Sequence, residues 1–332
     1  MPFIYISNAA SGDIHVYHLS DDGHLSSTDV ARLGGNLAPM AVNPSKNLLY
    51  VARRGDSSAL ISLDMDDAST GKLHMRSETP VDAKMSYLGL DRTGQYLVGV
   101  SYHSHSLTVC KIDQSHMILP NQTVIPTRKH PHSIQFTQDN QHALIASLGD
   151  DEMLVYAFDE NSGELTALEP NTWKARTGSG PRHIQFHPNG QFIYVLNEHD
   201  ATLDVLRWDN NSAQLHLLQT LETLPESFTG KAWAADIHLT PDGRFLYTSD
   251  RNSSTLALFG LNADTGLATF IAHTPTELQP RSFAISPSGS HLMAAGQKSD
   301  HVSLYRIDAL TGKLDFQERL PTGTEPIWIE II

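Results

Sequence analysis

The chain has 332 residues, with 23 Lys and Arg against 37 Asp and Glu, which gives a formal charge of −14 at pH 7. This acidic excess argues against a general nucleic-acid binder, because phosphate contacts need a basic surface. It still allows a small anionic ligand to bind at a local cluster of basic residues. A single cysteine, Cys110, excludes an intramolecular disulfide and a zinc site built from several cysteines.

Membrane and export signals are not apparent in the sequence. The segment 1–8 has neither a basic start nor a long apolar run. Apolar stretches elsewhere fall short of the ~20 residues that a membrane helix needs. We therefore expect a cytoplasmic protein with no nucleic-acid, membrane or obligate protein partner.

A repeated pattern organises the chain. In each copy an apolar strand segment leads into a turn, often Pro-x-Gly, and a second apolar segment follows. The turns align at Pro44, Asp91, Gln138, Pro188, Pro241 and Pro287, at intervals of 47, 47, 50, 53 and 46 residues. Repeats of about 40–50 residues are typical of β-propellers.

Each copy contains four short segments with the composition of β-strands. In one copy they cover 237–239, 245–248, 255–261 and 268–274, separated by turns rich in Gly, Asp, Asn and Ser. β-Branched and aromatic residues are frequent in these segments, which favours strand over helix. The sequence therefore predicts four antiparallel strands in each repeat.

The two ends of the chain complete the repeat count. Residues 3–8 match the second strand of the other copies, and residues 326–332 match the first strand. Six whole copies and one divided copy make seven. We predict an all-β, seven-bladed propeller in a single domain, 1–332. Strands from both termini close one blade, which removes the exposed edges of an open ring.

Side chains at the start of each first strand are expected to face one mouth of the central channel. Basic residues gather there from these strands and from the loops between second and third strands: Arg53, His132, Arg182, Arg251, Arg281 and Lys298. Arginine binds phosphate and carboxylate groups bidentately, and lysine binds them as a point charge. This pattern predicts an anionic small molecule as the ligand.

Other chemistry is not supported by the sequence. His183 and His187 have the i, i+4 spacing of a zinc pair on a helix. On a strand the same spacing spans about 13 Å, which is too far for one ion, so no metal site is expected. The sequence has no phosphate-binding Gly-rich loop and no Gly-x-Ser-x-Gly motif that would indicate a serine nucleophile.

Several longer stretches carry a resemblance to a known family. Residues 180–183, 197–198, 233–238, 279–281 and 294–299 are similar to those of the propeller-type bacterial 6-phosphogluconolactonases, within the lactonase seven-bladed propeller family. The resemblance implies hydrolysis of 6-phospho-D-glucono-1,5-lactone to 6-phospho-D-gluconate, in the oxidative pentose phosphate pathway. It implies no cofactor, and its partner is a small anionic sugar-phosphate lactone.

The resemblance also implies site residues at His132, Arg182, Glu198 and Arg281. His132, Glu198 and Arg182 are the expected catalytic residues. His132 or Glu198 would activate water, and Arg182 would stabilise the oxyanion. Arg281, helped by Lys298 or Arg251, would hold the phosphate. The expected substrate-binding residues are Arg281, Lys298, Arg251, His183 and Asp236.

Two other functions stay open at this point. A carboxymuconate-type cycloisomerase would use a similar Arg-rich mouth, but its base would transfer a proton to carbon instead of activating water. A non-catalytic propeller would use the mouth or rim to bind a peptide. Against the second alternative, the basic residues converge on inner strands instead of spreading over the rim.

Overall fold

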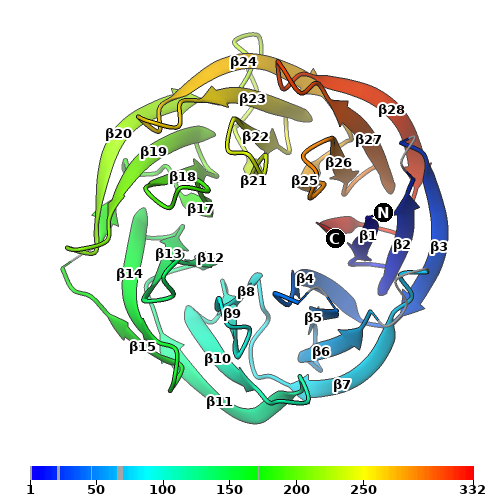
Figure 1. The fold of residues 1–332 in the computed structure, drawn as a ribbon, viewed down its shortest axis with the longest axis vertical. Coiled ribbons are helices and arrows are strands. Elements are labelled where there is room, and N and C mark those ends of the chain that lie inside the picture. Colours follow the sequence, from blue (N-terminus) through cyan, green and yellow to red (C-terminus); the bar gives the residue numbers. More distant parts are fainter. Residues whose placement is uncertain (1, 21–22, 46, 66–69, 171) are drawn as a thin grey trace.

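The computed structural model describes the whole chain except residues 1, 21–22, 46, 66–69 and 171. Within that part, 29 strands form seven antiparallel sheets. The sheets stand around a central channel like the blades of a propeller (Figure 1). The predicted seven-bladed, all-β fold is thus confirmed. No helix in the described residues is long and apolar enough to cross a membrane.

Six of the sheets are built from strands that are consecutive in the described chain. From the channel outwards they consist of β4–β7 (Asn36–Val42, Leu48–Arg54, Ala59–Asp64, His74–Pro80), β8–β11 (Tyr87–Leu90, Tyr96–Ser101, Ser106–Ile112, Ile118–Pro126), β12–β15 (Pro131–Phe136, His142–Ser147, Glu152–Asp159, Glu164–Ala167) with β16 (Trp173–Lys174) paired to β14, β17–β20 (Pro181–Phe186, Phe192–Asn197, Thr202–Asp209, Gln214–Glu222), β21–β24 (Ala234–Leu239, Phe245–Asp250, Thr255–Leu261, Ala268–Pro275) and β25–β28 (Pro280–Ile285, His291–Gly296, His301–Ile307, Leu314–Pro321).

The seventh sheet joins the two ends of the chain. Its strand order is β29 (Pro326–Ile331), β1 (Phe3–Asn8), β2 (Asp13–Leu19) and β3 (Leu25–Arg32). Strand β29 pairs antiparallel with β1, with Ile329 opposite Ile6 and Ile331 opposite Ile4. Ile4, Ile6 and Ile329 are buried in one apolar cluster with the neighbouring blade. The predicted closure by both termini is confirmed.

Buried tyrosines on several second strands tie one blade to the next. Tyr194 donates a hydrogen bond of 2.9 Å to the carbonyl oxygen of Gly266, and Tyr5 donates one of 3.0 Å to that of Gly71. Each glycine lies in a turn of the adjacent blade at positive φ, where a side chain is disfavoured. The repeated sequence pattern therefore encodes contacts between blades as well as the strands within them.

A β-bulge near the start of the inner strands aims side chains at the channel. Pairing shifts register between Pro131 and Ser133 in β12, between Pro181 and His183 in β17, and between Pro280 and Ser282 in β25. A bulge leaves one residue outside the regular ladder and re-aims its side chain. The residues in these bulges are His132, Arg182 and Arg281.

Candidate functional site

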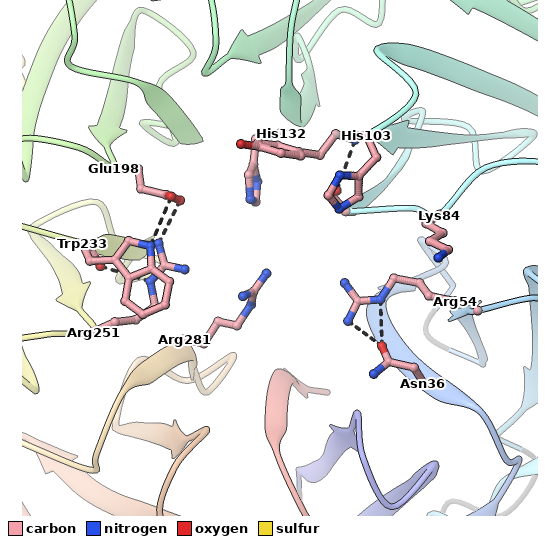
Figure 2. A pocket seen from close by; sticks show the side chains of 12 residues that line it. Asn36, Arg54, Lys84, His103, His132, Glu198, Trp233, Arg251 and Arg281 are labelled. Carbon is pink, nitrogen blue, oxygen red and sulfur yellow. Dashed lines mark hydrogen bonds and ion pairs between the residues drawn. The ribbon is translucent and has the colours of Figure 1, made fainter.

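A cavity of about 420 Å³ lies at one mouth of the channel. Its lining comes from the starts of inner strands and from the ends of second strands with the loops beside them, so six blades contribute residues. Figure 2 shows the labelled side chains around the cavity. The volume falls within the range of small-molecule sites. The lining residues are Asn36, Arg54, Gly55, Lys84, Ser86, Tyr102, His103, His132, Glu198, Trp233, Arg251 and Arg281.

Glu198 is held by three side chains on one side of this cavity. Its Oε2 atom lies 2.7 Å from Nε of Arg182 and 2.8 Å from an Nη atom of Arg251, and its Oε1 accepts a 3.3 Å bond from the Trp233 indole. Burial raises the pKa of the carboxyl group, but Arg182 and Arg251 outweigh burial and leave the pKa below its usual value. Glu198 is therefore ionised at neutral pH, with its charge balanced by arginine.

Arg182 lies beneath the cavity and does not line it. Its side chain is 2 % exposed. One Nη atom donates to the carbonyl oxygen of Ala235 and lies 3.0 Å from Nε2 of His183. With Nε bonded to Glu198, most of the guanidinium donors are engaged within the protein. This arrangement suits Arg182 to fixing Glu198 in place, in contrast to the expected role at the oxyanion.

His183 and Asp236 extend this hydrogen-bond chain below the cavity. Nδ1 of His183 lies 2.8 Å from Oδ1 of Asp236. Because Nε2 accepts from Arg182, the ring proton must sit on Nδ1 and be donated to the aspartate. Burial and the charge of Arg182 lower the pKa of His183 to about 4, so the ring stays neutral at pH 7. Asp236 orients His183, and His183 in turn orients Arg182.

His132 lines the cavity between its two ends (Figure 2). Its Nδ1 atom is buried and has no hydrogen-bond partner among the residues that the structure describes. Burial, together with Arg182 and His183, lowers its pKa well below the usual value. The imidazole is therefore neutral at physiological pH, which is the protonation state of a general base.

Arg281 extends into the cavity from β25, on the side away from His132 (Figure 2). Its guanidinium makes no hydrogen bond or ion pair with any residue in the described part of the chain. Burial, followed by repulsion from Arg182 and Arg251, lowers its pKa to about 9, and the group remains cationic at neutral pH. A partly buried cation with unused donors is suited to an anionic group of a ligand.

Two basic residues that the sequence analysis did not single out line the far end of the cavity. Arg54 donates hydrogen bonds of 2.9 and 2.7 Å to Oδ1 of Asn36, and Lys84 lies beside it (Figure 2). The expected Arg53 instead pairs with Glu78 outside the cavity. Side chains of adjacent strand residues point to opposite faces. The alternation of side chains along β5 could therefore have indicated that Arg54, and not Arg53, faces the cavity.

Lys298 was expected in the site but does not line the cavity. Its side chain is 61 % exposed on the rim, and its Nζ atom lies 3.7 Å from Glu325. Arg251 does line the cavity, with its guanidinium 3.9 Å from the centre of the Trp233 ring. The structure thus brings together His132, Glu198, Arg251 and Arg281, with Arg182, His183 and Asp236 beneath them.

The charge balance of the cavity is positive. Glu198 is the one carboxylate among its described lining residues, and Arg182 and Arg251 pair with it. Arg54, Lys84 and Arg281 remain without an acidic partner at ion-pair distance among the described residues. Groups of His, Cys, Asp and Glu that would hold a metal ion are absent from the same part of the chain. The arrangement provides a neutral imidazole and several cations for an anionic, oxygen-rich ligand.

The fold and this site define a class of protein: the chain belongs to the lactonase family of seven-bladed β-propellers, whose family model matches residues 4–331. Among curated proteins it is similar to the 6-phosphogluconolactonase of Serratia proteamaculans, with 36 % identity over 282 residues that cover 85 % of this chain and 84 % of that protein. The 6-phosphogluconolactonase of an Enterobacter species is 35 % identical over 285 residues, with the same two coverages.

Solved structures give the same fold. A periplasmic gluconolactonase of Pseudomonas aeruginosa matches with a TM-score of 0.92 and 26 % identity, over 100 % of this chain and 99 % of its own. A protein of Bacteroides fragilis, described as a putative 6-phosphogluconolactonase, matches with a TM-score of 0.91 at 23 % identity, over 100 % of this chain and 98 % of its own. At that identity the second match supports the fold alone.

Proposed function

We propose that the protein hydrolyses 6-phospho-D-glucono-1,5-lactone to 6-phospho-D-gluconate. The names of the bacterial relatives support this substrate. The observation that carries the proposal is the pairing of a neutral imidazole, His132, with an unpartnered guanidinium, Arg281, in one cavity. A lactone needs a base to activate water and a positive charge beside the carbonyl oxygen, and these two side chains supply them.

His132 is the proposed general base. As water adds to C1 of the lactone, the imidazole takes one proton from that water. The C1–O5 bond then breaks, and the imidazolium returns the proton to the ring oxygen, which becomes the 5-hydroxyl group. The new carboxylic acid loses its proton to solvent at neutral pH. The base is regenerated in each cycle, so no cofactor enters the balance.

Glu198 is the weaker candidate for the base. Its two oxygens accept hydrogen bonds from Arg182, Arg251 and Trp233. These contacts occupy both oxygens of the carboxylate, whereas Nδ1 of His132 has no hydrogen-bond partner among the described residues. We assign Glu198 the task of holding Arg251 at the cavity wall.

Arg281 and Arg251 are the proposed partners of the oxyanion that forms at the carbonyl oxygen. Both line the cavity, whereas the guanidinium of Arg182 lies beneath it. Charge-assisted donors aimed at the developing oxyanion are worth more in a buried site than in water. This assignment moves Arg281 from the expected phosphate contact to the reacting carbonyl group.

Steady-state hydrolysis of the phosphorylated lactone tests the proposal. The purified protein should consume the lactone faster than the spontaneous reaction, whose rate is subtracted from every measurement. A His132→Gln variant with an unchanged melting temperature provides the matched control. Hydrolysis at the spontaneous rate would refute the proposal, and conversion of carboxymuconate by the same preparation would favour the cycloisomerase instead.

A further inference from the structure

We propose that Arg54 and Lys84 form a phosphate-binding subsite that orients the substrate across the channel. The inference rests on the proposed function, because it places the phosphate of that same lactone. It differs from the expectation that Arg281, helped by Lys298 or Arg251, holds the phosphate. The observation behind it is the distribution of unpaired positive charge in the cavity.

The two ends of the cavity come from different blades. Arg54 is the last residue of β5, and Lys84 precedes β8. Glu198, Trp233 and Arg251 come from two blades across the channel. Figure 2 shows Arg54 and Lys84 together on one side and the Glu198 group on the other. His132 and Arg281 lie between these ends, so the reacting carbonyl group belongs in the middle of the cavity.

The end formed by Arg54 and Lys84 has the larger excess of positive charge. At the Glu198 end the carboxylate pairs with Arg182 and Arg251. At the other end, Arg54 contacts the neutral amide of Asn36, and Lys84 has no acidic partner at ion-pair distance among the described residues. Glu325 is the acidic residue whose charge favours the ionised form of Arg54, and it lies 3.7 Å from Lys298 on the rim.

Arg54 is prepared for a bidentate contact. Its Nε and one Nη atom both donate to Oδ1 of Asn36, which fixes the plane of the guanidinium. The other Nη atom has no hydrogen-bond partner among the residues that the structure describes. An arginine held in one orientation loses less side-chain entropy on binding phosphate. Ser86, which also lines the cavity, adds a hydroxyl group close to this end.

The chemistry of the substrate requires separation between the two subsites. The phosphate is attached at C6 and the carbonyl group is C1, on opposite sides of the ring oxygen. A phosphate held by Arg54 and Lys84 therefore directs C1 toward His132 and Arg281. Phosphate binding in the middle of the cavity, at Arg281, would displace the carbonyl group from the proposed base.

The test compares two substrates in matched variants. In wild-type protein, 6-phospho-D-glucono-1,5-lactone should exceed D-glucono-1,5-lactone in kcat/KM by on the order of 10²-fold. Arg54→Gln and Lys84→Gln should each lower kcat/KM for the phosphorylated lactone by about tenfold or more, and leave the unphosphorylated lactone within about twofold. Lys231→Gln removes an exposed lysine from the same mouth, outside the cavity, and should change neither value.

A binding experiment separates this proposal from the proposed function. Inorganic phosphate should raise the melting temperature of wild-type and Lys231→Gln proteins, and the rise should shrink in Arg54→Gln and Lys84→Gln. This result would support the subsite even if neither lactone were hydrolysed. Equal losses on both substrates in the Arg54 and Lys84 variants would overturn the subsite. So would phosphate stabilisation that is lost only in Arg281→Gln or Lys298→Gln.

Discussion

Replacing Glu198 with glutamine should destabilise the protein, because this carboxylate forms ion pairs with two buried guanidinium groups. The side chains of Arg182 and Arg251 are 2 % and 3 % exposed, and Glu198 is 15 % exposed. Removing one partner of a buried ion pair costs about 3–5 kcal/mol. Glutamine keeps one hydrogen-bond acceptor, so the lower value of about 3 kcal/mol is expected for Glu198→Gln.

That energy translates into a measurable melting shift. For 332 residues, an unfolding entropy of about 2.1 cal/mol/K per residue gives roughly 0.7 kcal/mol/K, and 3 kcal/mol then lowers Tm by about 4 °C. Scanning calorimetry at pH 7 and low salt measures the shift. Glu226→Gln removes an exposed carboxylate at the same mouth and should leave Tm unchanged.

The pH dependence of Tm tests more sharply whether Glu198 stabilises the fold as an ionised carboxylate. Because the pKa of Glu198 is lowered in the folded protein, its stabilising contribution is present above the unfolded pKa of about 4.5 and is lost as pH falls through the folded value. The gap between wild type and Glu198→Gln should therefore close in acid. A Glu198→Gln variant with wild-type Tm at pH 7 but a kcat lowered by about 10²–10⁴-fold would show that Glu198 is the base. Its assigned role of holding Arg251 at the cavity wall would then be wrong.

Three further predictions concern closure, catalysis and the buried histidine. Ile329→Ala should lower the free energy of unfolding by about 2–5 kcal/mol, because Ile329 is 2 % exposed in the closing strand. Leu310→Ala, at an exposed site, should leave Tm unchanged. Equal melting curves for the two variants would contradict the closure. His132→Gln should lower kcat by about 10²–10⁴-fold with little change in KM, and a wild-type kcat would exclude His132 as the base. His183 has a folded pKa of about 4, so the unfolded chain binds its proton first and wild-type stability should fall from about pH 6.5 toward pH 4. His183→Gln should show a shallower fall, and parallel pH profiles of Tm would count against a buried neutral ring.

The fold was predictable because it follows from a repeated local pattern. Turn signals recur at a nearly constant spacing, and the partial copies at the two ends match complementary strands. The inner-strand site residues were predictable for the same reason, since the bulges place His132, Arg182 and Arg281 at equivalent positions in three blades. Position within a repeat was enough to identify them.

The partners of these side chains were not predictable, because they come from other blades or from irregular loops. Arg182 faces Glu198 and Ala235 instead of the cavity, which depends on how neighbouring blades pack. Lys298 was assigned to the site because its loop lies at the mouth, but its side chain lies on the rim near Glu325. The direction of the Arg54 side chain depends on the phase of its strand, and that of Lys84 depends on the path of its loop. The composition of the sequence indicates neither the phase nor the path.

The pairing of β1 with β29 has a consequence for synthesis of the chain. About 320 residues separate these two strands, and at roughly 5–20 residues per second the ribosome needs about 15–60 s to make them. During this interval β1 can pair with β2, but its channel-side edge has no partner. Open strand edges invite pairing with other chains. The nascent ring is therefore most exposed to misassembly just before its last strand emerges, and slowing translation late in the message would prolong that interval.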